Sequence, residues 1–276
     1  MFVLPVGDSI MVGTTDIPIQ GPPETELTSA EELDYLLKLT NELFPHIELT
    51  PAEIDFFYCG VRPLPYVDAN SPSAISRGHA IRTQQIKKPE GKTLSLLTLI
   101  GGKLTTCRAL AEDVVREVGS ILKIDLNMNS RDRLYPGGEN YPQHKTALNE
   151  VQKNVATEYG LELEQVQWLW DFYGTRLKSI LAECQQSGEP LADVVPHTKF
   201  PVALVRWILR NEWVPHLEGL VNRRLMLLYE APLRRTTLES LATLMVEAGL
   251  LDQDKVESAI TELVEYLSRN YGKQTF

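Results

Sequence analysis

The sequence predicts an α+β protein in which a mixed β-sheet domain over residues 1–123 precedes an all-α domain over residues 143–276. Three observations predict this division. Short runs rich in β-branched and aromatic residues, which are typical of strands, are concentrated before residue 101. Apolar residues at helical spacing dominate the chain after residue 144. Residues 124–142 collect Asn, Asp, Pro and Gly, which indicates a surface linker.

The first domain opens on a predicted β-hairpin. Residues 2–6 and 10–14 are short β-rich runs, and the Gly-Asp-Ser sequence between them suits a turn. Thr28 or Ser29 then caps a predicted helix, and Pro51 opens a short second one. Further β-rich runs predict strands at residues 56–64, 74–77, 80–84 and 94–100.

Residues 94–122 predict a buried strand, a glycine pair and a helix. The apolar run LSLLTLI ends at Gly101 and Gly102, and apolar residues of the following helix recur at three- and four-residue steps. The glycines remove side chains from the turn, so the backbone N–H groups at the helix N-terminus are open to an electron-rich or anionic group. Lys103 adds a positive charge there. A tight turn without a ligand is the alternative interpretation.

Seven helices are predicted after the linker from their apolar periodicity. They span residues 145–159, 163–173, 177–186, 201–213, 217–230, 238–248 and 255–271. Four tryptophans fall at helical spacing among aliphatic residues in this region and are predicted to lie in the core: Trp168, Trp170, Trp207 and Trp213. The pair Arg223 and Arg224 is predicted to lie on a solvated or salt-bridged helix face.

The charge balance limits the classes of partner. With 27 Lys and Arg against 37 Asp and Glu, the net charge is −10, which disfavours nucleic acid and gives no general attraction to an anionic membrane. A bound anion must therefore be held by a local basic cluster. Cys59, Cys107 and Cys184 form no CxxC pair, so we expect a reduced, cytoplasmic chain without a disulfide framework or a metal site.

Three short strings resemble the FAD-dependent glycerol-3-phosphate dehydrogenases and the related glycerophosphate oxidases. Residues 101–108, GGKLTTCR, resemble the flavin-contacting GGKLTTYR of that family, with Cys where Tyr is usual. Residues 60–64, GVRPL, match a second family string, whose arginine reaches into the substrate pocket. Residues 73–77, SAISR, resemble the family segment AISRD, a further source of a pocket arginine. The segment VGTTD at residues 12–16 resembles the family at the same place.

The resemblance implies an activity and a site. The activity is oxidation of sn-glycerol 3-phosphate to dihydroxyacetone phosphate, with hydride transfer from C2 to FAD. Arg62 is implied to be catalytic, and the phosphate dianion suits a cluster of the three substrate-binding cations Arg62, Arg77 and Lys103. The implied FAD-binding residues, which offer backbone N–H groups to the flavin pyrimidine edge, are Gly101, Gly102, Lys103, Leu104 and Thr105.

One part of the family pattern is missing. No two glycines in the chain are two positions apart, so the Gly-x-Gly-x-x-Gly loop that holds the FAD pyrophosphate is absent. The resemblance therefore covers this chain but only about the C-terminal half of a family member. We expect a fragment, a truncated product, or a chain whose N-terminal FAD-binding segment is a separate partner. In isolation it is expected to be inactive.

Two alternatives to the dehydrogenase stay open. One is a glycerol-3-phosphate oxidase of the same family, and the other is a non-catalytic helical interaction module derived from it. The resemblance further implies a quinone or another electron acceptor as a partner. It allows peripheral contact of the complete, cytoplasmic enzyme with the inner face of the cell membrane.

Overall fold

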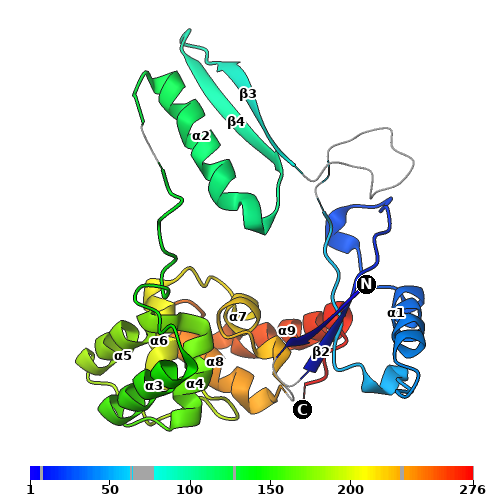
Figure 1. Ribbon diagram of the computed structural model, residues 1–276, viewed down its shortest axis with the longest axis vertical. Helices are drawn as coiled ribbons and strands as arrows, with labels where there is room; N and C mark the ends of the chain where they lie inside the picture. The colour runs from blue at the N-terminus through cyan, green and yellow to red at the C-terminus, as the bar shows by residue number, and fades with distance from the viewer. Residues whose placement is uncertain (7–8, 63, 65–77, 127–128, 231–232, 276) are drawn as a thin grey trace. The chain divides into compact units, whose positions relative to one another are not determined.

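The computed structural model describes residues 1–6, 9–62, 64, 78–126, 129–230 and 233–275 (Figure 1). The chain forms two compact units. Met1–Thr14, Leu27–Tyr58 and Leu134–Phe276 form one, called here the helical unit, and Thr15–Glu26 with Cys59–Arg133 form the other, called the hairpin unit. Each unit combines segments that are distant in sequence. These units do not coincide with the ranges predicted for the domains, and those ranges stay a prediction.

The α+β class is confirmed. Strand β1 (Phe2–Val6) pairs with β2 (Ser9–Gly13), and β3 (His79–Lys87) pairs with β4 (Thr93–Gly101). Both pairs are antiparallel, because strands joined by a short turn reverse direction, whereas a parallel neighbour requires a long crossover. The described strands therefore form two separate antiparallel sheets instead of one mixed sheet.

The strand predicted at residues 56–64 does not form over residues 56–62. The N–H group of Phe57 donates to the carbonyl oxygen of Tyr271 at 2.9 Å, and the ring of Phe56 stands edge-on to that of Tyr229 at 5.4 Å. This β-rich sequence is therefore used to pack aromatic rings in the helical unit, so tertiary contacts override its strand propensity. The run predicted at residues 74–77 lies outside the described residues.

The helical unit contains most of the predicted helices. Its α-helices are α1 (Ala30–Leu43), α3 (Lys145–Tyr159), α4 (Leu163–Tyr173), α5 (Leu177–Gln186), α6 (Val202–Asn211), α7 (Leu217–Gly219), α8 (Arg235–Glu247) and α9 (Val256–Tyr271). Ser29 caps α1 with a reciprocal bond to Glu32, as predicted. The single helix predicted at residues 217–230 is instead divided, because a π-helical turn follows α7 and Met226 adopts a left-handed backbone with φ 52°.

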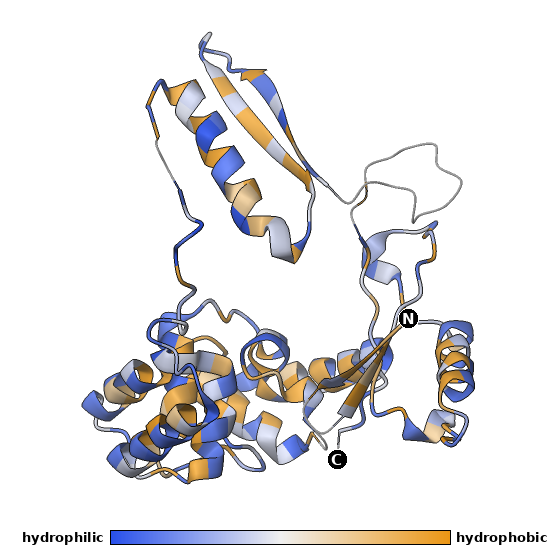
Figure 2. Ribbon diagram, in the orientation of Figure 1, coloured by the Kyte–Doolittle hydropathy of each residue, from blue (hydrophilic) through white to orange (hydrophobic). Residues whose placement is uncertain are grey.

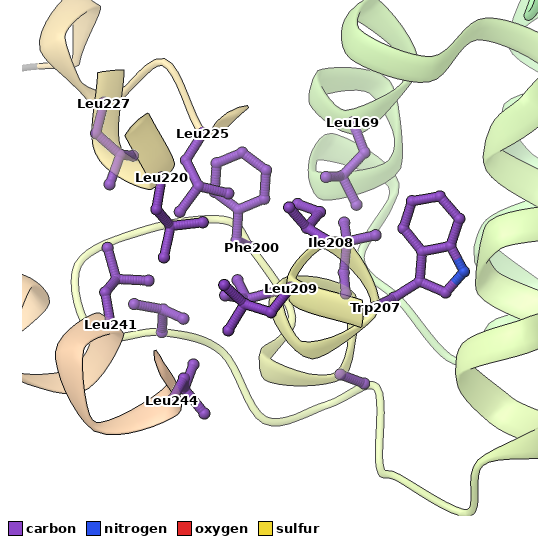
Figure 3. Packing of buried hydrophobic residues seen from close by; sticks show 14 of the residues in the cluster. Leu169, Phe200, Trp207, Ile208, Leu209, Leu220, Leu225, Leu227, Leu241 and Leu244 are labelled. Atoms are coloured by element: carbon purple, nitrogen blue, oxygen red, sulfur yellow. The ribbon is translucent and has the colours of Figure 1, made fainter. Parts of the chain in front are cut away.

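Helices α3 to α9 enclose an apolar core, to which α1 contributes no residue. Figure 3 shows side chains from several helices, among them Leu169, Ile208 and Leu241, converging on one another. Phe200 lies fully buried in this core, with its ring centroid 4.6 Å from that of Trp168 and 5.7 Å from that of Phe172. Burial of aliphatic and aromatic surface is the main stabilising term for such a unit.

The prediction for the tryptophans holds for three of the four. Trp170 and Trp207 are buried, and Trp168 packs against the core. Trp213, however, is 83% exposed. Helix α6 ends at Asn211, and Glu212 has an extended backbone, so the helical spacing that predicted burial no longer applies at Trp213.

The hairpin unit consists mainly of β3, β4 and α2 (Cys107–Leu122), which a single 3₁₀ turn, η4 (Leu104–Thr106), precedes. Helix α2 packs on one face of the β3–β4 hairpin, where Thr83 donates to Glu117 at 3.2 Å. Figure 2 shows apolar residues following one another along β4. The prediction that this strand is buried is nevertheless wrong, because Leu94, Leu96 and Leu99 are 49%, 43% and 51% exposed and α2 covers only one face of the two-stranded sheet. Nowhere in the described parts of the chain does a helix combine the length and apolar character needed to cross a bilayer.

Truncation of the buried ring at residue 200 tests the core. We expect Phe200→Ala to lower the free energy of unfolding by about 3–5 kcal/mol, because it leaves a cavity between Trp168 and Phe172. Trp213→Ala is the matched control, and since that ring is exposed, its effect should stay within about 0.5 kcal/mol. Urea unfolding followed by circular dichroism measures both, and similar losses in the two variants would contradict this assignment of the core.

Candidate functional site

The candidate site is the turn that joins β4 to α2. His79 and Gly101 are register partners at the end of the hairpin. Gly101 and Gly102 have φ of 70° and 96°, in the region that side chains disfavour. A Cβ atom at residue 101 would lie 2.6 Å from the carbonyl oxygen of Gly78, which leaves no room for a side chain. The glycine pair is thus required by both conformation and space.

The turn presents backbone donors that the protein does not use. In the described residues, the N–H groups of Leu104 and Thr105 have no hydrogen-bond partner. Gly102 directly follows the last pair of the β3–β4 ladder, His79 and Gly101, and its N–H group faces that ladder. The N–H group of Lys103, which was also predicted to be a donor, is bonded to the hydroxyl of Thr106 at 3.1 Å. Two free donors therefore lie just before the positive end of a 16-residue helix, an arrangement that favours an anionic or electron-rich group.

A polar cluster supports this turn from the side. His79 Nε2 lies 3.1 Å from Asp113 Oδ2, and Arg116 donates to the other oxygen of Asp113 at 2.6 Å. The bond with His79, and next the bond from Arg116, lowers the pKa of the Asp113 carboxyl. Because His79 faces Gly101 across the hairpin, its link to Asp113 fixes the end of the hairpin to α2. Sequence reasoning assigned no role to His79 or Asp113 in the site.

A second group of polar contacts, centred on Glu112 and called here the Glu112 clip, fixes α2 to the chain that follows it. Ser130 donates to Glu112 Oε1 through both its N–H group, at 2.7 Å, and its hydroxyl, at 2.6 Å, and Arg108 donates to the same oxygen at 2.8 Å. The hydroxyl bond from Ser130, then its backbone bond, lowers the pKa of the Glu112 carboxyl. The clip therefore depends on Glu112 being ionised.

Arg62, the predicted catalytic residue, is held by an ion pair. Its guanidinium Nη1 lies 3.0 Å from Asp16 Oδ2, and both side chains are about two-fifths exposed. The pair joins two segments of the hairpin unit that are 46 residues apart. Sequence reasoning missed this partner, although Asp16 is the last residue of the VGTTD segment that resembles the family, which could have pointed to it.

The predicted cation cluster is only partly visible. Lys103 is exposed, and its ammonium group has no ion-pair partner in the part of the chain that the structure describes. Arg77 lies outside the described residues. A shared concavity for Arg62, Arg77 and Lys103, and the flavin-binding roles of Gly101 to Thr105, therefore stay predictions.

Comparisons with known proteins bear directly on this turn. Over 227 residues the chain is 31% identical to a glycerol-3-phosphate dehydrogenase of Synechocystis sp., covering 81% of this chain and 39% of that protein. Over 193 residues it is 32% identical to an aerobic glycerol-3-phosphate dehydrogenase of Staphylococcus aureus, covering 68% of this chain and 33% of that protein. The chain is a relative of the glycerol-3-phosphate dehydrogenases. The resemblance predicted from three short strings is confirmed.

Two further similarities concern the fold. Residues 128–256 match the family described as the C-terminal domain of alpha-glycerophosphate oxidase. The X-ray structure of the glycerol-3-phosphate dehydrogenase from Bacillus halodurans complexed with FAD superimposes with a TM-score of 0.66 at 20% identity. That match covers 95% of this chain and 49% of the other, so the two share a fold. The chain spans less than half the length of each of these relatives.

The glycine turn can be tested with a matched pair of substitutions. Gly101→Ala and Gly91→Ala both force a side chain onto a left-handed backbone, at a cost of roughly 1–2 kcal/mol. A Cβ at residue 91 meets nothing within 4 Å, whereas one at residue 101 collides with Gly78. We therefore expect Gly101→Ala to destabilise the hairpin unit clearly more than Gly91→Ala, as measured by amide hydrogen exchange in β3 and β4. Equal effects would show that the close approach does not constrain the turn.

The Glu112 clip predicts a defined pH response. A carboxyl with a lowered pKa stabilises the fold at pH values above its ordinary pKa of 4.5, and this contribution is lost as the pH falls through the lowered value. We expect the amide resonance of Ser130 to stay unchanged from neutral pH to about pH 4.5 and to shift below it. In Glu112→Gln, which keeps an acceptor but removes the charge, the shift should be absent. A titration at Ser130 that persists in this variant would assign it to another group.

Proposed function

We propose that this chain forms the C-terminal part of an FAD-dependent glycerol-3-phosphate dehydrogenase, in which sn-glycerol 3-phosphate is oxidised to dihydroxyacetone phosphate. The observation that carries the proposal is the pair of N–H donors of Leu104 and Thr105, which have no partner among the residues that the structure describes. It lies in the GGKLTTCR segment, whose family counterpart contacts flavin, and it belongs to a chain related to glycerol-3-phosphate dehydrogenases.

The residues at the turn fit the edge of a flavin. Two neighbouring backbone donors suit the pyrimidine edge of the isoalloxazine ring, where negative charge collects on reduction. Gly101 and Gly102 let a flat ring approach the backbone without meeting a side chain. When bound there, FAD would accept the hydride from C2 of the substrate. The turn would hold the ring in place, and α2 would contribute its positive dipole end.

The substrate is a phosphate monoester and needs cations in an acidic protein. Lys103 supplies an ammonium group beside the turn, and no carboxylate of the described residues pairs with it. Arg62 supplies a planar guanidinium, whose orientation is fixed by the bond from Nη1 to Asp16. We assign Arg62, Arg77 and Lys103 to the phosphate and C2-hydroxyl side of the flavin. In this assignment Asp16 is a positioning residue for Arg62.

The chain alone offers too little contact to retain FAD. Two hydrogen bonds contribute about 0.5–1.5 kcal/mol each, whereas association costs about 4–15 kcal/mol, so the affinity is weaker than millimolar. No glycine-rich pyrophosphate loop is present in the sequence. The relatives are more than twice as long as the matched region, and we assign adenine, ribose and pyrophosphate binding to the additional part.

A chimera tests the proposal. This chain would replace the matching C-terminal region of the Synechocystis relative, and the purified protein would be compared with this chain alone after incubation with FAD and desalting. We expect the chimera to keep flavin absorbance and to be bleached anaerobically by glycerol 3-phosphate. The isolated chain should emerge colourless, because its contacts give an affinity weaker than millimolar. An isolated chain that retains flavin would contradict the assignment of half the site to another segment.

Variants of the chimera separate substrate binding from flavin binding. Lys103→Ala and Arg62→Ala should raise KM about tenfold or more, since each removes a charge-assisted contact to phosphate, while the bound flavin fraction stays unchanged. Lys92→Ala is the control, because Lys92 is an exposed lysine at the turn of the same hairpin, at the opposite end from Gly101. Loss of flavin together with substrate use would overturn the assignment of Lys103 to the substrate side.

An oxidase is the second candidate, because residues 128–256 match a domain described by its occurrence in alpha-glycerophosphate oxidase. The two activities differ only in the electron acceptor. Oxygen consumption and hydrogen peroxide formation by the chimera, compared with reduction of a quinone analogue, distinguish them. Cytoplasmic location with peripheral membrane contact is part of the dehydrogenase proposal and would be tested by fractionation of the complete enzyme.

A further inference from the structure

Strand β4 has the sequence of an interior strand, although it lies at the edge of its sheet. It reads TLSLLTLIG, with five leucine or isoleucine residues, no charged residue and no proline. Edge strands usually carry charged residues or prolines, which discourage further strands from adding to them. Strand β3 follows that rule with Arg82 and Lys87. In the described residues no strand lies beyond β4, so this strand lacks the protection that an exposed edge needs.

The register of the hairpin identifies the N–H groups at this edge. At the turn, the N–H group of Lys88 donates to the carbonyl oxygen of Lys92 at 2.8 Å, so this pair is hydrogen-bonded. Bonded and non-bonded pairs alternate along antiparallel strands. The N–H groups of Ser95, Leu97 and Leu99 therefore point away from β3. The described part of the chain supplies no backbone partner for this row of donors.

The face of the hairpin that α2 leaves uncovered is apolar beside this edge (Figure 1). His79 and Thr83 bond to α2, and successive side chains of a strand point to opposite faces, so Ile86 faces away from the helix. Leu94, its register partner, and Leu96 lie on the same face. Each of these three apolar side chains is more than two-fifths exposed. An apolar patch next to an open strand edge is typical of a surface that another polypeptide covers.

The relatives contain a polypeptide that can cover this surface. The chain matches 39% of the Synechocystis protein and 33% of the Staphylococcus protein, so more than half of each lies outside the matched region. A second copy of this chain is less suitable, because both copies would carry a net charge of −10 and repel each other.

We propose that a β-strand from this additional part of the complete enzyme pairs with the free edge of β4, and that apolar side chains beside it cover Ile86, Leu94 and Leu96. The inference rests on the function proposed above, because it takes the partner to be the segment that binds the rest of FAD. Since β4 ends at Gly101, the added strand would run beside the glycine turn and hold it in a larger sheet.

Amide-resolved hydrogen exchange tests this pairing in the isolated chain and in the chimera described above. In the isolated chain, the outward amides of Ser95, Leu97 and Leu99 should exchange fast, whereas the inward amides of Leu94 and Leu96 should be protected by β3. In the chimera the outward amides should exchange about tenfold more slowly or less. Outward amides that are already protected in the isolated chain, or that stay fast in the folded chimera, would overturn the inference.

Substitutions in the chimera separate the edge from the face. Ser95→Pro removes one outward donor and keeps the inward ladder, and Leu96→Lys places a charge in the apolar patch. Both should restore fast exchange at Leu97 and Leu99, whereas Leu122→Lys, at an exposed leucine of α2, should not. Slow exchange that persists in both variants would contradict the pairing.

The exchange measurement does not depend on flavin, so the inference and the proposed function can fail separately. A chimera that retains flavin but has fast outward amides would overturn only the strand pairing. A chimera with slow outward amides that binds no flavin would overturn only the proposed function and support the pairing.

Discussion

The hairpin unit depends on one close approach of two backbones, in which the carbonyl oxygen of Gly78 occupies the space that a side chain at residue 101 would need. The start of β3 can lie beside the end of β4 only because nothing projects from Gly101. The chain then leaves the strand on a left-handed backbone and enters a 3₁₀ turn, whose first N–H groups, those of Leu104 and Thr105, have no partner in the described residues.

Many of the arginines in this acidic chain are already paired with carboxylates. In a chain of net charge −10, most of the arginines for which contacts are described bind carboxylates: Arg206 and Arg210 share Glu189, and Arg224 binds Glu212. Such pairs on a surface contribute little to stability, but they occupy the charge of the arginines that form them. Lys103, beside the glycine turn, has no such partner in the part of the chain that the structure describes.

The sequence predicted the helices well because their signals are local. The boundaries of α3, α4 and α5 agree with the prediction, since apolar periodicity identifies each helix and Gly160 and Gly174 mark two of the ends. The errors occurred where distant contacts decide. Residues 56–62 lack a strand because Phe57 bonds to Tyr271, and Asp16 was missed because no local pattern links it to Arg62 across 46 residues. The bond of the Lys103 N–H group to Thr106 was missed for another reason, because a threonine hydroxyl competing for a turn donor is not visible in periodicity.

The interleaving of the two units has a consequence for how such a chain can change over generations. The chain passes from one unit to the other after Thr14, Glu26, Tyr58 and Arg133. A single cut therefore cannot separate one whole unit from the other, and a gene broken within residues 27–58 would leave both products with incomplete units. A frameshift or an early stop leaves one unit whole only if it falls beyond residue 133, so truncation alters the two units together.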